Sequence, residues 1–182
     1  MQIVASDIGK AVKEVVLSES VEHFPVLAQL QDSGRCRFLE PVQATLRVVR
    51  TDAVIEVSGT VAVVLALPCR RCLEETRCAV CGDIHQSYVE HLPRVTGEDG
   101  EELELSADEM GLVLYDGEMI DLVAEVEQQV LLLMPDTVLC SEGCRGLCPQ
   151  CGANLNHESC TCADKVTSLQ FAALRDFKVE KK

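Results

Sequence analysis

The stretch Val54–Leu73 reads VIEVSGTVAVVLALPCRRCL, and the expected fold depends on it more than on any other part of the chain. Its Val, Ile and Thr content fits a pleated, half-buried strand better than a helix, with an interruption expected at Ser58-Gly59. The strand ends at Pro68, directly before Cys69-Arg-Arg-Cys72. We therefore expect a long β-strand that leads into a turn carrying two cysteines.

Alternating patterns flank this strand on both sides. From about Pro41, apolar and polar side chains alternate, as they do in a strand with one buried face. The apolar set is Val42, Ala44, Leu46 and Val48, and the polar set is Gln43, Thr45 and Arg47. Thr51-Asp52 marks a turn, and a rough alternation resumes from Thr76 to His91, which makes Cys69–Leu73 the bend of a hairpin. Consecutive strands of this kind predict an antiparallel sheet or a partial barrel.

The period changes to that of a helix between Asp121 and Met134. Four apolar residues fall on one helical face, namely Val123, Val126, Val130 and Leu133. Asp121 is the expected N-cap, and Pro135 ends the helix. We expect this helix to cover one face of the sheet, which gives an α+β fold. A second, shorter helix is expected over residues 168–177.

A strongly acidic stretch divides the chain. Residues 98–109 hold seven carboxylates, too many for a packed core, so we interpret them as a solvated linker. The expected organisation is a mostly β domain over 1–97 with the CxxC hairpin, the linker, and a part over 110–182. This last part comprises the helix and a Cys-rich, metal-binding segment that packs on the first.

Composition and charge limit the function. The chain has 182 residues, and its net charge of −14 disfavours general attraction to nucleic acid phosphates. Its longest uninterrupted apolar stretch, Val61–Leu67, is too short to span a bilayer. We therefore expect a soluble cytoplasmic protein without a membrane partner. In that reducing compartment, eleven cysteines indicate metal ligation or redox chemistry rather than structural disulfides.

The C-terminal cysteines have the spacing of a zinc site. Cys148-Pro149-Gln150-Cys151-Gly152 resembles a zinc knuckle, in which the glycine lets the backbone turn beneath the metal. Cys160 and Cys162 can complete the shell of four thiolates. His157 could replace a cysteine, although a solvated loop residue is the simpler interpretation. Iron–sulfur clusters also use four thiolates, so the ligand types alone leave both chemistries open.

Two arrangements are open for Cys69 and Cys72. Cys78 and Cys81 could complete a local site. If residues 76–90 form a strand, however, that pair projects from opposite faces and cannot share an ion. Cys140 and Cys144, which follow Pro135, are then the natural partners and would clamp the C-terminal segment onto the sheet. We interpret Cys36, Cys78 and Cys81 as small buried hydrophobic residues.

The sequence provides little support for catalysis. It contains no Gly-rich phosphate loop and no nucleophile elbow, and its acidic run is typical of a solvated segment rather than a carboxylate pair. A thiol redox protein or sensor using Cys69 and Cys72 is the alternative, although the pair lacks the βαβ context of thioredoxin-like motifs. We therefore expect a protein that is not an enzyme.

Three further stretches carry a family resemblance. They are Val61–Leu67 leading into Cys69-Arg70-Arg71-Cys72-Leu73, Ile120-Asp121-Leu122 through Glu127 to Leu133-Met134-Pro135, and Phe171-Ala172-Ala173-Leu174. Together with Cys144-Arg-Gly-Leu-Cys-Pro-Gln-Cys151-Gly-Ala-Asn-Leu-Asn156 and Cys160-Thr-Cys162, the chain resembles the cysteine-rich form of the YceD family, the large ribosomal RNA subunit accumulation proteins. Cys78 and Cys81 depart from the usual hairpin pattern.

The resemblance implies a part in the synthesis, processing or accumulation of large-subunit ribosomal RNA, without implying a reaction. The expected cofactor is zinc, as one or two ions. The expected partners are a ribosomal RNA precursor, basic ribosomal proteins or an assembly intermediate, and the acidic charge favours the basic proteins or the intermediate. A structural zinc protein that binds some other protein partner is a further alternative.

Overall fold

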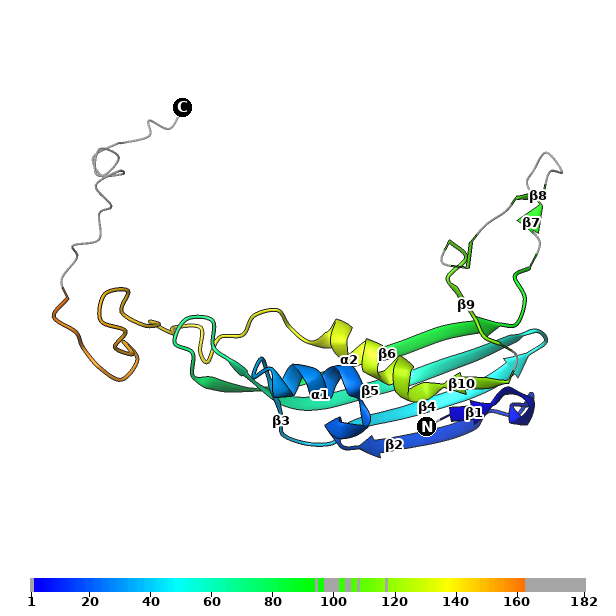
Figure 1. Ribbon diagram of the computed structural model, residues 1–182, viewed down its shortest axis with the longest axis horizontal. Helices are drawn as coiled ribbons and strands as arrows, with labels where there is room; N and C mark the ends of the chain where they lie inside the picture. The colour runs from blue at the N-terminus through cyan, green and yellow to red at the C-terminus, as the bar shows by residue number, and fades with distance from the viewer. Residues whose placement is uncertain are drawn as a thin grey trace, which may run out of the picture.

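The computed structural model describes residues 2–93, 95–96, 102–103, 106–107, 109–116 and 118–162. Its strands and helices are labelled in Figure 1. The strands are β1 (Gln2–Val4), β2 (Lys13–Glu19), β3 (Arg37–Phe38), β4 (Val42–Thr51), β5 (Val54–Pro68), β6 (Glu75–Val89), β7 (Val95–Thr96), β8 (Glu102–Leu103), β9 (Leu112–Leu114) and β10 (Met119–Asp121). The helices are α1 (Pro25–Asp32) and α2 (Leu122–Leu133), with 3₁₀ turns at Ala5–Asp7 and Val21–His23.

The main sheet is open and has the order β2-β4-β5-β6-β9, with β3 also paired to β5. All of its pairs are antiparallel except β6 with β9, which is parallel. The turn between β4 and β5 is Asp52-Ala53, one residue later than the sequence indicates, because Thr51 pairs with Val54. The fold is therefore α+β as predicted, with an open sheet rather than a partial barrel.

The expected interruption at Ser58-Gly59 is wrong, because β5 runs through both residues without a break. Gly59 pairs with Leu46 of β4. A Cβ atom added at Gly59 would lie 2.0 Å from the carbonyl oxygen of Thr45. The glycine thus permits a close approach of β4 to β5, and this role explains its presence in a strand.

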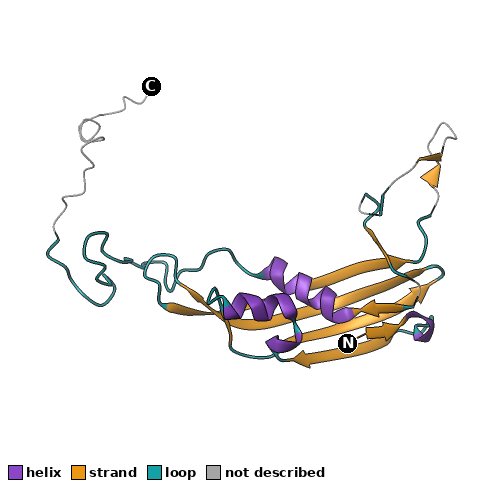
Figure 2. Cartoon of the chain, in the orientation of Figure 1, coloured by secondary structure: helices purple, strands orange, loops and turns teal. Residues whose placement is uncertain are grey.

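One face of the sheet is buried beneath the helices, which lie side by side along it (Figure 2). In β4 the predicted inward set is confirmed, since Val42, Leu46 and Val48 have no exposed surface and Ala44 is 3% exposed. Leu27 of α1 and Val126 and Val130 of α2 belong to the same core cluster. The alternation in the sequence therefore defines which face the helices cover.

α2 follows its prediction closely. The Asp121 side chain accepts hydrogen bonds from the backbone N–H groups of Val123 and Ala124, and so caps the helix. Of the predicted apolar face, Val126 and Val130 are buried, while Val123 and Leu133 are partly buried against the core. The helix ends at Leu133, two residues before Pro135. The chain then leaves the sheet face toward the β5–β6 turn (Figure 1).

The short strand β1 pairs with β10, which leads directly into α2. This pairing joins the start of the chain to the residues that follow the acidic stretch. The division at residues 98–109 remains a prediction, because most of that stretch lies outside the described residues. The helix expected over 168–177 also lies outside them. No described helix is long and apolar enough to cross a membrane.

Glu127 is a buried carboxylate that connects the two helices. Its side chain lies in α2 and is 9% exposed. Its Oε1 accepts hydrogen bonds from the backbone N–H groups of Val26 at 2.7 Å and Leu27 at 3.2 Å. Phe24, the N-cap of α1, provides no side-chain cap of its own. Glu127 therefore caps α1 from a distance, where the positive end of the helix dipole also favours its charge.

We expect the substitution Glu127→Ala to lower the free energy of unfolding by about 1–3 kcal/mol, because it leaves the buried N–H of Leu27 and the partly buried N–H of Val26 without their acceptor. Urea unfolding followed by circular dichroism measures the change. Gln128→Ala, at an exposed position of the same helix, is the matched control and should stay within about 0.5 kcal/mol of the parent chain. Equal effects of the two substitutions would contradict the capping role.

Candidate metal centres

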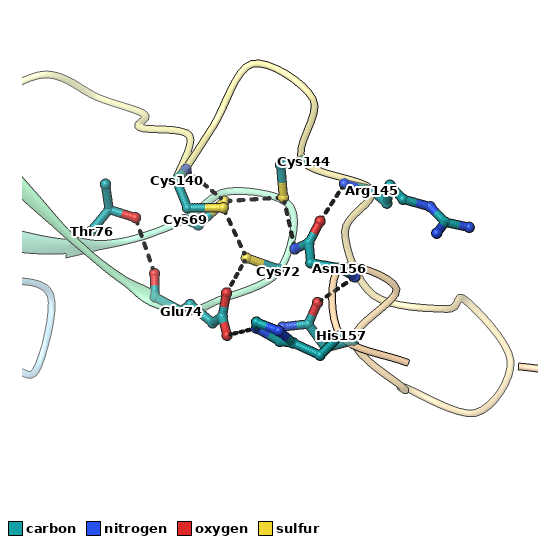
Figure 3. A network of polar contacts seen from close by, with 10 residues as sticks. Cys69, Cys72, Glu74, Thr76, Cys140, Cys144, Arg145, Asn156 and His157 are labelled. Atoms are coloured by element: carbon teal, nitrogen blue, oxygen red, sulfur yellow. Dashed lines mark hydrogen bonds and ion pairs between the residues drawn. The ribbon is translucent and has the colours of Figure 1, made fainter. Parts of the chain in front are cut away.

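The first candidate centre lies at the tip of the β5–β6 hairpin. Cys69 and Cys72 belong to the turn, and Cys140 and Cys144 come from the loop after α2 (Figure 3). The four sulfurs lie within 4.8 Å of one another, with 3.7 Å between the Sγ atoms of Cys69 and Cys144 and 3.5 Å between those of Cys72 and Cys140. A tetrahedral ion with Zn–S bonds of about 2.3 Å separates its sulfurs by about 3.8 Å. We call these residues the hairpin group; they can hold one metal ion.

Backbone contacts bring the two halves of the hairpin group together. Val138 forms a parallel bridge with Cys69, and its carbonyl accepts a hydrogen bond of 2.9 Å from the Arg70 N–H. The Cys140 N–H donates to the Cys69 sulfur at 3.4 Å. The loop after α2 is thus hydrogen-bonded along the turn, which places Cys140 and Cys144 beside the CRRC cysteines.

Cys78 and Cys81 do not join either metal group among the described residues. Both lie in β6, where Cys78 is half-buried and Cys81 is exposed. Their odd separation places them on opposite faces of the strand, as the second of the two sequence alternatives requires. Cys36 is buried as expected, but burial as a small hydrophobic residue does not describe Cys81.

The electrostatics of the hairpin group favour thiolates at two of its four positions. Hydrogen bonds from backbone N–H groups, chiefly that of Cys72, lower the pKa of Cys69 to about 6. The Asn156 amide lowers the pKa of Cys144. Burial raises the pKa of Cys72, and the Cys144 side chain raises that of Cys140. A divalent cation would stabilise all four sulfurs as thiolates, which the protein alone does not.

The second candidate centre, the C-terminal group, consists of Cys148, Cys151, Cys160 and Cys162. These sulfurs also lie within 4.8 Å of one another. The Cys148 N–H donates to the Ala153 carbonyl at 2.8 Å, and the Gly152 N–H donates to the Cys148 carbonyl at 2.9 Å. Gly152 has a φ of 75°, which is the tight turn expected beneath a metal. This group is local and can likewise hold one ion.

In the C-terminal group, too, the pKa values of individual thiols are shifted in opposite directions. Backbone N–H groups of Cys151 and Gln150 lower the pKa of Cys148 to about 6. The Cys148 side chain raises the pKa of Cys160, and the Cys151 side chain raises that of Cys162 to about 11. Three of the four cysteines are at least partly exposed, so the loop has little apolar surface to stabilise it. A bound ion would therefore contribute much of the folding energy of this segment.

Sequence reasoning missed the contacts that two polar residues, Asn156 and His157, make between the groups. His157 belongs to neither four-cysteine group; its Nε2 pairs with Oε1 of Glu74, next to the hairpin turn, at 2.6 Å (Figure 3). This contact holds the pKa of Glu74 below its usual value. The Asn156 amide donates to the Cys144 sulfur at 3.3 Å. Asn156 and His157 lie in the loop of residues 146–157, which we call the knuckle. No spacing in the sequence indicates that the knuckle contacts the hairpin.

The fold and these groups define an α+β protein with two four-cysteine groups, one at the tip of the central hairpin and one in the C-terminal loop, each able to hold a metal ion. The sequence model of the family described as "Large ribosomal RNA subunit accumulation protein YceD" matches residues 57–178. The chain therefore belongs to the YceD family. The matched region includes most of β5, the hairpin turn, α2 and both cysteine groups.

Individual relatives agree with this assignment. The chain is 28% identical over 140 residues to the "Large ribosomal RNA subunit accumulation protein YCED homolog 1, chloroplastic" of Arabidopsis thaliana, covering 67% of this chain and 44% of the relative. It is 35% identical over 113 residues to the uncharacterized protein Rv2926c of Mycobacterium tuberculosis, covering 62% of this chain and 51% of the relative. The chain thus spans about half the length of these curated relatives. No solved structure matches it.

We expect removal of metal by a chelator to loosen residues 138–162 far more than the sheet, because a bound ion there takes the place of a core. Hydrogen exchange followed by mass spectrometry, with and without chelator, measures this locally. Peptides from β4 and from the buried part of β5 serve as the internal control and should keep their protection. Equal loss of protection in both regions would contradict the assignment, as would no loss in either.

Proposed function

We propose that this chain is a non-enzymatic accessory factor in the synthesis, processing or accumulation of large-subunit (23S) ribosomal RNA, and so acts in ribosome biogenesis. The observation that carries the proposal is the family match over residues 57–178, which spans the hairpin turn and both cysteine groups. The Arabidopsis relative is named for large ribosomal RNA subunit accumulation. Family membership supports the process, and the two cysteine groups are the part of the structure to which we assign the role.

The cofactor that we propose is zinc, with one ion in each group. Sulfur separations of 3.5 and 3.7 Å suit a single tetrahedral ion of the zinc type. A cluster of several irons and sulfides would need more room than four sulfurs within 4.8 Å of one another leave between them. Short Cys-x2-Cys turns beside backbone N–H groups are also the usual setting of structural zinc.

A structural rather than catalytic role for the metal follows from the number of ligands. Catalytic zinc keeps an open position for water or substrate, whereas a shell of four protein ligands is closed. Each group supplies four sulfurs. In this proposal the ions hold the hairpin tip and the C-terminal loop in a fixed geometry that a partner can bind.

The partners that we propose are basic ribosomal proteins or an assembly intermediate that contains the ribosomal RNA precursor. The net charge of −14 would repel free RNA over most of the surface and would attract basic proteins. Any direct RNA contact would therefore be local. We place the protein in the cytoplasm, where eleven cysteines can remain reduced and available to metal.

The test is complementation of a strain that lacks the gene. We expect the deletion to lower 23S ribosomal RNA relative to 16S, and the parent chain to restore the ratio. Cys69→Ser and Cys148→Ser should each remove one zinc ion from the purified protein and restore the ratio less well. Cys81→Ser, at an exposed cysteine outside both groups, is the control and should behave as the parent.

An unchanged 23S level and unchanged subunit ratios in the deletion strain, under several growth conditions, would overturn the ribosomal proposal. A structural zinc protein with another partner would then be the better description. A pull-down with the parent chain and with Cys69→Ser would identify that partner, provided that its capture needs the intact hairpin group.

A second candidate function is a thiol redox protein or sensor that uses Cys69 and Cys72. The pKa of about 6 at Cys69 favours it, because a thiolate is the reactive form of cysteine. Against it, Cys72 has a raised pKa and the pair lies at a strand turn rather than at a helix N-terminus. Thiol trapping in cells separates the two functions: reversible oxidation of both residues supports the redox function, and continuous protection by metal supports the structural one.

A further inference from the structure

The loop that holds the C-terminal group also contacts the hairpin group. Within the loop, Leu147 and Asn154 form an antiparallel bridge, and the Leu155 N–H donates to the Gly146 carbonyl at 2.9 Å. These bonds close the knuckle around Cys148 and Cys151. The same knuckle lies against the hairpin group, where Asn156 contacts Cys144 and His157 contacts Glu74 (Figure 3).

The contact between knuckle and turn is close. The Leu147 N–H donates to the Arg71 carbonyl at 3.0 Å, and the Leu147 side chain packs against the buried cluster of Cys69, Cys72 and Cys144. A Cβ atom added at Gly146 would lie 3.0 Å from the Arg71 carbonyl oxygen. Backbone and side chain of the knuckle thus lie against three of the four cysteines of the hairpin group, while Cys140 stays exposed.

Asn156 is the most direct connection between the groups. Its Nδ2 donates to the Cys144 sulfur at 3.3 Å, and its Oδ1 accepts from the Arg145 N–H at 2.7 Å. Its own backbone N–H donates to Oδ1 of Asn154 within the knuckle at 3.0 Å. The residue is therefore fixed by the loop of one group and presents a donor to a ligand of the other.

We infer that the two centres bind metal cooperatively, with Asn156 as the positioning residue that transmits the coupling. This inference rests on the metal binding that we propose for both groups. An ion in the C-terminal group fixes the knuckle, and the fixed knuckle holds the Asn156 amide and Leu147 against the hairpin group. A donor to a ligating thiolate stabilises its charge and its orientation, so an ordered knuckle raises the affinity of the hairpin group.

The coupling must act in both directions. Linkage requires that an ion in the hairpin group raises the affinity of the C-terminal group by the same factor. The contact between Nε2 of His157 and Oε1 of Glu74 provides a second connection between the same elements. The coupling therefore narrows the range of metal supply over which only one group is filled, and it favours joint ordering of the hairpin tip and the C-terminal loop.

The test is chelator competition on the full chain loaded with cobalt(II), read from the absorbance of its thiolate complexes. Three chains are compared: the parent, Cys151→Ser/Cys162→Ser, which empties the C-terminal group, and Cys69→Ser/Cys140→Ser, which empties the hairpin group. In the parent the first ion leaves while the other group is still filled. The double variant that keeps this more weakly binding group should therefore release its ion at a lower chelator concentration than the first phase of the parent. A coupling of about 10-fold in affinity is expected, within the usual range of about 5- to 150-fold.

Asn156→Asp tests the route of the coupling. The aspartate keeps the acceptor for the Arg145 N–H but places a carboxylate oxygen where the donor to Cys144 was. We expect it to weaken the hairpin group by about 10-fold in the parent background. In the chain with an emptied C-terminal group its effect should be much smaller. Ser159→Ala, at an exposed position of the same loop, is the matched control and should leave both ions unaffected.

A double variant that keeps the more weakly binding group and releases its ion at the chelator concentration of the parent's first phase would overturn the cooperativity while leaving metal binding intact. An equal effect of Asn156→Asp in both backgrounds would overturn its role as the connection. A parent chain that binds no cobalt would overturn the proposed metal binding itself, and the inference with it.

Discussion

The pairing of β5 with β6 is the interaction on which the rest of the structure depends. Both strands have 15 residues, and their register holds from Val54 opposite Val89 to Pro68 opposite Glu75. This ladder forms the centre of the main sheet and places the CRRC turn at its end. The inward face of β5 contributes Val57, Val61 and Leu65 to the core. One hairpin therefore sets both the surface on which the helices pack and the position of Cys69 and Cys72.

The helices then determine where Cys140 and Cys144, the second half of the hairpin group, lie. α2 packs on the sheet through Val126 and Val130, and Glu127 fastens α1 beside it. Because α2 ends just before Pro135, the chain must continue off the sheet face, and Val138 meets Cys69 at the turn. The length and direction of α2 therefore determine that the loop with Cys140 and Cys144 reaches the hairpin turn.

The sequence predicted what local periodicity and capping determine. The alternation of β4, the hairpin around the CRRC turn, the Asp121 cap and the grouping of Cys148 with Cys151 follow from spacing over a few residues. It could not choose the partners of Cys69 until β6 was known to be a strand. Contacts such as that of Glu127 with Val26, 101 residues apart, or of Asn156 with Cys144 depend on tertiary packing, which no local pattern encodes. At Gly59 a local rule gave the wrong answer, since a strand glycine there serves a close approach of two backbones.

The central claim is that two closed shells of four thiolates brace the end of an α+β sheet in a YceD family protein. X-ray absorption at the zinc edge, on the full chain purified without added metal, tests this most directly. The account predicts zinc in a shell of four sulfurs at about 2.3 Å, with no contribution from nitrogen or oxygen. A mixed shell containing nitrogen or oxygen, iron at these sites, or protein free of metal would contradict it.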